Sequence, residues 1–425
     1  MPSARSTTVR DLRRSNRART LWELYLNGPL TYQGVARAAG VSLATVSNVM
    51  SDLVRTGCVA EVGSEESNGG RPRGLFHINP DFGHVIGVDV GETAVMVELF
   101  DLGMRVRASH RSVTEDARLS PDDLVDHVIE GIDAVVAEAG IDEESILGVG
   151  VGVPGLVERV PVDAAAGDPD TPCPGDTEAV LYGQSIGWGD VPIERMLRAR
   201  TSLPLLVDNG ANTLGQAERW FGAARGSDNA VVVLLGSGVG ASIARGGEGG
   251  ASFAGELGHT TVVAGGKQCV CGARGCLEAY AGADAIVATY DRLTERDQAT
   301  SPSDVEDRMR AILAADDSDP AAAQAIDELV DYLGAGLGTI VNLFTPDRIV
   351  LGGWLGDALG QGLLERIHAA IGRTALARPF ERVASVPAAL GTDAVALGAA
   401  TLPVAEFLGS GGVERVLPLH GSATA

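Results

Sequence analysis

The sequence has 425 residues, a mean hydropathy of +0.13 and 45% hydrophobic residues. This length favours two or three compact units, and this apolar content excludes wholesale disorder. Because no apolar run is long enough to cross a bilayer and the basic N-terminus lacks the apolar stretch of a signal peptide, the sequence predicts a soluble, cytoplasmic protein without a membrane partner.

The net charge of −23 is divided unevenly along the chain. Residues 1–80 contain ten arginines and six acidic residues, whereas residues 81–425 contain 23 basic and 50 acidic residues. A basic head on an acidic body indicates that only the head is suited to bind a polyanion. The six arginines between Arg5 and Arg19 fit a solvated arm equally well, so charge alone leaves both interpretations open.

The head carries the pattern of three helices. The first is expected over residues 12–27, where an Asn-Gly-Pro stop signal begins. Thr31 is expected to cap a second helix that ends at Gly40. The spacing of Ala36, Gly40 and Val46 is typical of a helix-turn-helix, in which Ala allows close packing, Gly forms the turn and a branched residue fixes the next helix. A simple helical hairpin explains the same spacing.

The third helix begins at Ser42 and presents short polar or methyl-bearing residues, which suit base edges and thymine methyls in a major groove. The predicted DNA-contacting residues of this helix are Ser42, Ala44, Thr45, Ser47 and Asn48. Two short strands, 59–62 and 74–78, then flank a Gly-rich tip, where Arg71 and Arg73 are expected to enter a minor groove. We therefore expect residues 1–80 to be a winged helix-turn-helix domain that binds double-stranded DNA.

The body repeats one order of elements. Strands are predicted at 84–91, 94–100 and 105–113, a helix at 121–139 and a buried strand at 146–153, and a related series follows at 204–208, 211–221, 230–235 and 240–244. Two similar α/β halves imply two lobes around a cleft, where small ligands usually bind. The glycine-rich turns at 89–93 and 236–240 can hold phosphate, although tight strand connections explain them equally well.

The strongest chemical signal lies between Gly255 and Tyr280. This stretch supplies one imidazole and three thiols within eighteen positions, from His259, Cys269, Cys271 and Cys276. The set fits a closed, structural Zn²⁺ site better than it fits reduced cysteines in an ordinary loop. The metal would fix the loop that carries Glu256 and Glu278, whose carboxylates can accept hydrogen bonds from several sugar hydroxyls.

Several motifs together resemble the ROK family of repressors, open reading frames and sugar kinases. They are Asp89-x-Gly91-x-Thr93, Gly152-Val-Pro-Gly155, Asn209 with Asn212, Glu256-x-Gly-His259, the CxCGxxGCxE run and Leu351-Gly-Gly-Trp354. The resemblance covers essentially the whole chain, and the winged helix indicates the xylose- and N-acetylglucosamine-responsive repressor branch. It implies a two-lobed, actin-like (ribonuclease-H-like) α/β body of the ATPase and sugar-kinase type. One lobe would span 83–205, completed by a helix at about 393–408, and the other 206–390 with a zinc loop at 255–280.

The resemblance also implies which residues bind the sugar and which residues of the family kinases are replaced in this chain. Asn209, Glu256, His259 and Glu278 would bind a sugar, and His259 would hold the zinc as well. Gly210 stands where the family kinases have a catalytic Asp, and glycine cannot accept a proton. Glu92 and Ala94 replace a glycine and a lysine near the kinase phosphates, and a carboxylate there is repulsive. These departures predict no catalytic residue, no use of ATP and no enzymatic activity.

The sequence thus predicts a sugar-responsive regulator, most simply a repressor of carbohydrate uptake or catabolism genes. A homodimer or homotetramer would bind an inverted repeat, and a sugar or sugar phosphate would be the effector. One alternative is a glucokinase-like enzyme fused to the head, with Asp208 as a displaced base, although Asp208 points to the opposite face if its strand continues. Another is a zinc-stabilised DNA-binding scaffold without an effector. Residues 157–176, around Cys173, are interpreted only as a surface loop.

Overall fold

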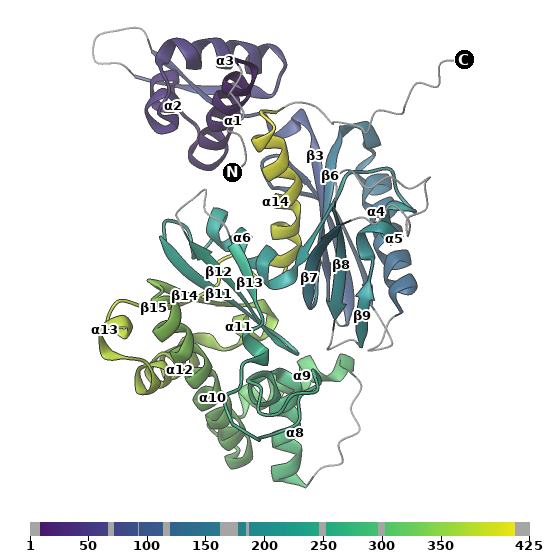
Figure 1. Ribbon diagram of the computed structural model, residues 1–425, viewed down its shortest axis with the longest axis vertical. Helices are drawn as coiled ribbons and strands as arrows, with labels where there is room; N and C mark the ends of the chain where they lie inside the picture. The colour runs from purple at the N-terminus through teal and green to yellow at the C-terminus, as the bar shows by residue number, and fades with distance from the viewer. Residues whose placement is uncertain are drawn as a thin grey trace.

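The computed structural model describes residues 9–66, 72–91, 93–113, 120–161, 177–183, 187–245, 252–295 and 302–412. Arg71, Glu92 and Cys173 lie outside these ranges. A helical head sits on one end of a body made of two α/β lobes (Figure 1). Within the described ranges, no helix combines the length and apolarity needed to cross a membrane.

The head contains three helices and a two-stranded antiparallel hairpin. Its elements are α1 (Val9–Asn27), α2 (Tyr32–Ala39), α3 (Leu43–Arg55), β1 (Val59–Glu65) and β2 (Arg73–Ile78). The Thr31 hydroxyl accepts the N–H of Gly34, and the Ser42 hydroxyl accepts the N–H of Thr45, so both predicted helix caps are confirmed. Gly40 has a φ of 62°, the left-handed conformation that the turn between the two helices requires.

The first lobe is built on a five-stranded sheet in the order β10-β6-β3-β4-β5. Its strands are β3 (His84–Val90), β4 (Ala94–Asp101), β5 (Val106–Val113), β6 (Ile146–Val153) and β10 (Leu205–Asn209). The predicted helix α4 (Pro121–Ala139) packs on one face of the sheet, and α14 (Ala394–Gly409) packs on the other. This sheet therefore depends on a helix from the far end of the sequence.

A small three-stranded sheet extends the first lobe. It contains β7 (Leu156–Pro161), β8 (Thr177–Gly183) and β9 (Trp188–Val191), and α5 (Ile193–Arg198) packs against it. The expectation of a surface loop from residue 157 is wrong for Val157–Pro161, which pair with β8. The strand is stabilised by partners distant in sequence, because the buried Glu194 accepts hydrogen bonds from Arg159 and from the N–H of Ala179. The rest of the predicted loop lies outside the described residues.

The second lobe repeats the arrangement of the first, with a sheet in the order β13-β12-β11-β14-β15. The strands are β11 (Asn229–Leu235), β12 (Val239–Arg245), β13 (Ser252–Gly255), β14 (Arg348–Gly352) and β15 (Ala384–Pro387). The helices are α6 (Gly210–Phe221), α7 (Glu278–Ala281), α8 (Ala283–Thr294), α9 (Pro302–Ala314), α10 (Pro320–Phe344), α11 (Gly353–Ala358), α12 (Gly360–Thr374) and α13 (Ala377–Phe380). In both lobes three antiparallel strands are followed by two parallel ones, as the predicted actin-like fold requires.

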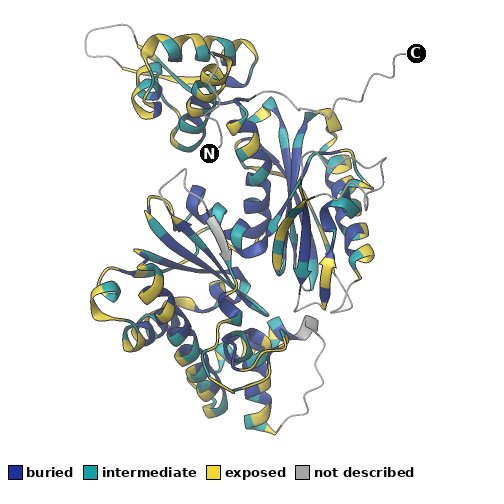
Figure 2. Cartoon of the chain, in the orientation of Figure 1, coloured by how far each residue is buried: buried dark blue, intermediate teal, exposed yellow. Residues whose placement is uncertain are grey.

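One apolar core joins the head to the body. It combines residues of the head helices with residues of α6 and α14, and its largest members include Leu21, Leu24, Met50, Leu53, Trp220 and Phe407. Figure 2 shows α14 as a largely buried helix that runs along the sheet of the first lobe, with one end close to the head. At the edge of this core the Arg225 guanidinium donates to the Leu26 carbonyl at 2.6 Å. The head is therefore packed onto the body and not merely tethered to it.

Candidate functional site

A cavity of about 820 Å³ lies between the two lobes. Its walls come from the start of β4, the β7–β8 hairpin, the first turn of α6, the 236–240 turn and the residue before α14. The four predicted sugar-binding residues, Asn209, Glu256, His259 and Glu278, all line it. A volume of this size is typical of small-molecule sites, which span about 300–1,000 Å³.

Asn209 stands where β10 ends and α6 begins, at the carboxyl edge of the parallel strands. Its side-chain oxygen accepts the N–H groups of Ala211 at 2.8 Å and Asn212 at 3.2 Å. Its Nδ2 donates to the Gly155 carbonyl at 2.6 Å. Because both acceptor positions and one N–H are used within the protein, the remaining amide N–H is what Asn209 offers to a ligand.

Glu278, Glu256 and His259 come together from two short elements of the second lobe. Glu278 begins α7 and accepts the N–H of Val239 at 3.0 Å, which fixes its carboxylate against the 236–240 turn. Glu256 Oε2 lies 4.0 Å from His259 Nε2. Burial raises the pKa of Glu256, His259 opposes that rise and Glu278 adds to it. The cluster offers carboxylate acceptors and an imidazole nitrogen to the hydroxyl groups of a ligand.

The predicted metal ligands form one cluster, in which the His259, Cys269, Cys271 and Cys276 ligand atoms all lie within 4.8 Å of one another. The distance from His259 Nδ1 to Cys269 Sγ is 3.6 Å, and that from Cys271 Sγ to Cys276 Sγ is 3.7 Å. Tetrahedral Zn²⁺ bonds of about 2.3 Å to sulfur and 2.0–2.1 Å to nitrogen imply separations of about 3.6 Å and 3.8 Å for such pairs. The cluster therefore fits a four-coordinate metal ion.

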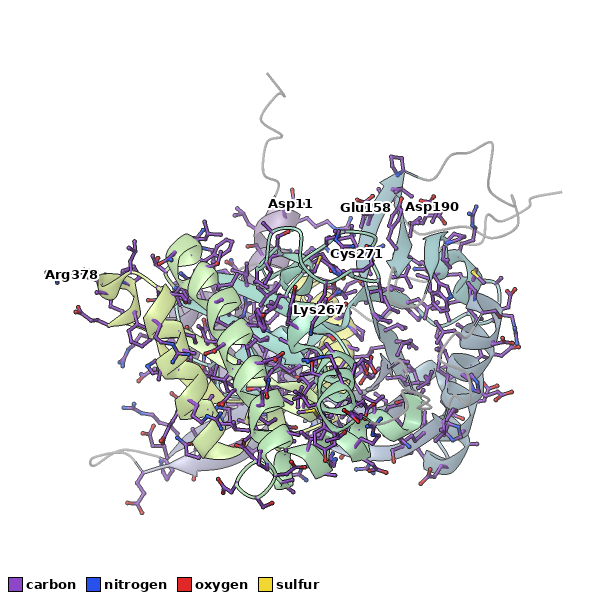
Figure 3. The ribbon with its side chains drawn as sticks, turned by 90° about the horizontal axis from the view of Figure 1, so that it is seen from below. Asp11, Glu158, Asp190, Lys267, Cys271 and Arg378 are labelled. Carbon is purple, nitrogen blue, oxygen red and sulfur yellow. The ribbon has the colours of Figure 1, made fainter. Side chains whose placement is uncertain are left out.

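His259 has two distinct sides. Its Nδ1 faces the cysteines, and its Nε2 is the nitrogen that lies near Glu256. A metal bound at Nδ1 leaves the proton of the neutral imidazole on Nε2, so the ring would donate a hydrogen bond toward the cavity. In Figure 3, Lys267 and Cys271 mark the metal-ligand loop, and Glu158 and Asp190 mark the β7–β9 sheet.

Gly210, which the resemblance places where the family kinases have their base, carries no titratable group. Gly210 is the first residue of α6 and lines the cavity. The Asp208 carboxylate is held elsewhere, accepting the N–H of Asn209 at 2.7 Å and the Nδ2 of Asn212 at 2.6 Å. Asp208 is not among the described residues that line the cavity, which agrees with its expected orientation toward the opposite face. Ala94, the replacement for the kinase lysine, lies in the cavity wall.

Three carboxylates gather at the first-lobe side of the cavity. Asp89 on β3 and Asp393 before α14 line it, and Glu98 on β4 is buried behind them with 6% of its surface exposed. Burial raises the pKa of Asp89 to about 7, and the Asp393 carboxylate contributes to the rise. Burial likewise raises the pKa of Glu98 to about 7, with further contributions from Asp393 and Asp89. These carboxylates would repel a phosphate that is not accompanied by a metal ion.

The third helix of the head presents most of its predicted DNA-contacting residues to solvent. Ser42, Ala44, Ser47 and Asn48 are exposed. Thr45 is half-buried, and its hydroxyl lies 2.8 Å from that of Ser42. Leu43, which is not among the predicted DNA contacts, is 47% exposed on the same helix. Its signal was an apolar residue at the first helical position, just after the cap, and its methyl groups suit thymine methyls.

Arg73 does not project freely from the hairpin. Its guanidinium donates to the Gln33 side chain at 2.9 Å and so links the hairpin to α2. The rings of Tyr32 and Phe76 make a second contact between the same elements, with centroids 4.8 Å apart. These contacts hold the hairpin beside the helix-turn-helix, where both can reach one DNA duplex.

Two helices run from the cavity to the head. Asn209 caps α6 at the cavity, and Trp220 near the other end of α6 packs in the head core. Val395 near the start of α14 also lines the cavity, and Phe407 near its end packs in that core. The two helices contact each other, and at Gly398 a Cβ atom would collide with the Thr213 carbonyl.

The end of α6 is also bound to the segment that leads into α14. The buried Glu218 carboxylate accepts the N–H groups of Ala389 at 3.0 Å and Leu390 at 3.1 Å, and that of Ala223 at 2.6 Å. The end of α6 near the head core is therefore held to the segment before α14 by hydrogen bonds as well as by packing.

Comparison with known proteins identifies relatives of two kinds. A model of the ROK family matches residues 85–406. The xylose repressor of Caldicellulosiruptor bescii is 27% identical over 408 residues, which cover 93% of this chain and 97% of the repressor. A glucokinase of Halalkalibacterium halodurans is 30% identical over 324 residues, which cover 74% of this chain and 92% of the kinase.

Among solved structures, a ROK family transcriptional regulator described as a homolog of the E. coli MLC protein covers 94% of this chain and 98% of its own, with a TM-score of 0.73 and 23% identity. At this level of identity, the similarity shows a shared fold. The regulators thus match the head and the body together, whereas the glucokinase matches only about three quarters of the chain.

Proposed function

This chain belongs to the ROK family, and we propose that it is a sugar-responsive transcriptional repressor whose winged helix binds operator DNA. The observation that carries the proposal is the pair of helices, α6 and α14, that joins the interlobe cavity to the core of the head. The match to a xylose repressor over nearly the full length of both chains supports the same assignment. A DNA-binding repressor must be in the same compartment as its DNA, which is consistent with the predicted cytoplasmic location.

The sugar site consists of Asn209, Glu256, His259 and Glu278. The free amide N–H of Asn209 donates to one hydroxyl group, and the two carboxylates accept hydrogen bonds from others. The metal ion is Zn²⁺, held by His259, Cys269, Cys271 and Cys276. It is structural: with four protein ligands it fixes the loop and orients the imidazole, which donates through Nε2.

The cavity closes around the sugar because its polar residues come from both lobes. Asn209 is bonded to Gly155 of the first lobe, whereas Glu278 is bonded to the second-lobe turn at Val239. A ligand that bridges them favours the closed arrangement over the open one. Closure moves α6 and α14 and thereby changes the placement of the head. In a homodimer on an inverted repeat, this changes the spacing of the two heads and weakens DNA binding.

Catalysis is not part of this function. Gly210 provides no base, and the hydrogen bonds of Asp208 to Asn209 and Asn212 hold its carboxylate away from the cavity. The glucokinase-like alternative needs Asp208 to leave those partners. It also needs a triphosphate to bind beside Asp89 and Asp393, which like charges oppose.

The deciding experiment selects DNA with the full chain and then measures its release by a panel of sugars. Two variants separate the head from the body: Asn48→Ala should weaken operator binding and leave sugar binding unchanged, and Glu278→Gln should do the reverse. An ADP-release assay on the same samples should give no sugar-dependent signal. Sugar-dependent ATP turnover, or an absence of sequence-specific DNA binding, would overturn the proposal.

A further inference from the structure

The cavity is larger than one sugar ring needs. Its volume of about 820 Å³ lies near the upper end of the range for small-molecule sites, roughly 300–1,000 Å³, which accommodates ligands of drug size. The four residues of the proposed sugar site occupy one part of it. The lining also contains Trp354, Glu306 and Arg310, from the contacting helices α11 and α9, with Gly236 beside Trp354. We call this second-lobe group the second part of the cavity.

Trp354 lies close to the proposed sugar site. It is half-buried near the start of α11, and its indole Nε1 would be 2.9 Å from a Cβ atom at Gly236. At Gly238, two residues further along the same tight turn, a Cβ atom would be 2.6 Å from Glu278 Oε2. Two residues span at most about 7 Å. The indole nitrogen and the Glu278 carboxylate are therefore at most about 13 Å apart, a separation that two linked sugar rings can span.

Polar groups accompany this indole. Glu306 and Arg310 lie one turn apart on α9 and form an ion pair at 2.5 Å, and both line the cavity. An aromatic face packs against the C–H face of a pyranose ring, while a carboxylate and a guanidinium bind its hydroxyl groups. Trp354, Glu306 and Arg310 together have the composition of a second sugar subsite.

The charge of the cavity opposes a nucleotide in this second part. The described lining contains six carboxylates, from Asp89, Glu158, Glu256, Glu278, Glu306 and Asp393. It contains two guanidinium groups, from Arg111 and Arg310, and the latter is already paired. A polyphosphate without a bound metal ion would be repelled by the net negative charge of the whole lining, and it would have to reach the Gly236 turn beside the indole of Trp354. A neutral glycan meets neither obstacle.

We propose that the effector is a neutral glycan of disaccharide size, with one ring at Asn209, Glu256, His259 and Glu278 and the next ring on Trp354, beside the ion pair of Glu306 and Arg310. This inference rests on the proposed function, because it extends the same sugar site. It makes Trp354 a specificity-determining residue, since a monosaccharide fills only the first part of the cavity.

Calorimetric titration of the full chain tests the proposal with defined probes: xylose and glucose, then xylobiose, cellobiose and maltose, and ATP. At least one disaccharide should bind about tenfold or more tightly than its own monosaccharide. Trp354→Ala should remove that preference and leave monosaccharide affinity within about threefold, whereas Trp354→Phe should retain part of it. Arg310→Ala, on a half-exposed side chain, should reduce disaccharide affinity without a risk to folding. Glu278→Gln should weaken both classes of sugar.

The outcomes separate the two proposals. If monosaccharides bind as tightly as every disaccharide, and neither Trp354→Ala nor Arg310→Ala changes any affinity, the second subsite is wrong while the sugar-responsive repressor stands. If ATP binds and Trp354→Ala changes its affinity, the second part of the cavity is a nucleotide site. If no sugar binds at all, the proposed function fails, and the disaccharide site fails with it.

Discussion

The rings of Trp22 and Trp220 meet edge to face, with their centroids 5.2 Å apart and their planes at 83°. Trp22 belongs to α1 of the head, and Trp220 belongs to α6 of the body, whose other end Asn209 caps inside the cavity. A helix of twelve residues is about 18 Å long and moves as a rigid element. The aromatic pair therefore joins the head to the helix whose other end lies in the cavity that we propose as the sugar site.

Substitution of Trp22 by Leu should uncouple sugar from DNA. The smaller side chain keeps an apolar contact but loses the edge-to-face packing on Trp220, so movement of α6 is passed to α1 less completely. We expect sugar and operator affinities measured separately to stay within about threefold, while the ratio of sugar affinities with and without operator falls from roughly 5–150-fold toward one. Titration of sugar in the presence and absence of operator gives this ratio.

The control for that experiment is Leu376→Ala, because this side chain is 66% exposed and lies far from α1 and α6 in the sequence. It should leave the ratio unchanged. An undiminished ratio in Trp22→Leu would show that the signal reaches the head by a route other than α1 and α6.

Glu256→Ala should produce a permanently repressing protein. The substitution removes one hydroxyl acceptor from the cavity and leaves the described head residues untouched, because Glu256 belongs to the second lobe. Operator affinity should remain within about twofold, and release by the sugar that acts on the unmodified protein should be lost over at least a hundredfold range of concentration. A gel-shift titration checks both. Release at the same sugar concentration would place the effector site elsewhere.

The metal site should matter more for the sugar response than for DNA binding. The protein should contain about one zinc ion per chain, and Cys271→Ser should lower that content and release the loop that positions His259 and Glu278. We expect sugar affinity to fall by more than about tenfold and operator affinity to change by less than about threefold. Metal analysis by mass spectrometry and the two binding assays test this.

Cys58 offers the matched control, because it is a buried cysteine of the head core and lies outside the metal cluster. Cys58→Ala should keep the full metal content. Zinc-free protein obtained without any chelator would contradict the assignment of the metal, and normal metal content in Cys271→Ser would contradict the assignment of this ligand.

Much of the local structure could be predicted from the sequence. The Thr31 and Ser42 caps and the Gly40 turn are encoded within a few residues, so their hydrogen bonds and backbone conformation were predictable from spacing alone. The metal cluster was predictable for a similar reason, since three of its ligands lie within eight residues and the donor set suits one kind of ion.

The long-range relationships could not be predicted in this way. Trp220 and Phe407 share a core with Trp22 although they lie about 200 and about 385 residues from it in the sequence. Each of these residues alone is consistent with an ordinary apolar position. Strand β7 was missed because, within the described ranges, it pairs only with β8, which follows residues 162–176 in the sequence. Asn209 was predicted only as a ligand-binding residue, so its role as the N-terminal cap of α6 was not predicted.

Stability should depend on pH through Glu98 and Asp89. The pKa of each is raised to about 7 in the folded protein by burial, from ordinary values near 4 in the unfolded chain. Between about pH 4 and pH 7, the folded state therefore binds more protons than the unfolded state. Because of this, the contribution of these two groups to the free energy of unfolding decreases as the pH rises through that range. Glu98→Gln keeps the shape without the charge, so it should be more stable than the unmodified protein above pH 7, by about 1–3 kcal/mol.

Thermal unfolding of Glu98→Gln and the unmodified protein between pH 5 and pH 8 measures this effect. The two melting temperatures should diverge as the pH rises. Glu381→Gln, on an exposed residue, should follow the unmodified protein throughout. Parallel curves for Glu98→Gln would mean that Glu98 does not bind a proton preferentially in the folded state.

DNA recognition should be tested by point substitutions on α3 and not by removal of residues 1–80. Because Trp220 and Phe407 share a core with the head, a truncated body would expose apolar surface and lose stability together with DNA binding.

Asn48→Ala and Leu43→Ala change exposed side chains only, and each lost base contact should cost about 1–3 kcal/mol of operator affinity, or roughly 5–150-fold. Fluorescence anisotropy on operator and on scrambled DNA separates this loss from non-specific binding, which should change little and should weaken steeply with salt in every variant. Equal losses on both DNAs would instead assign these residues to backbone contacts, and unchanged operator affinity in both variants would remove α3 from the interface.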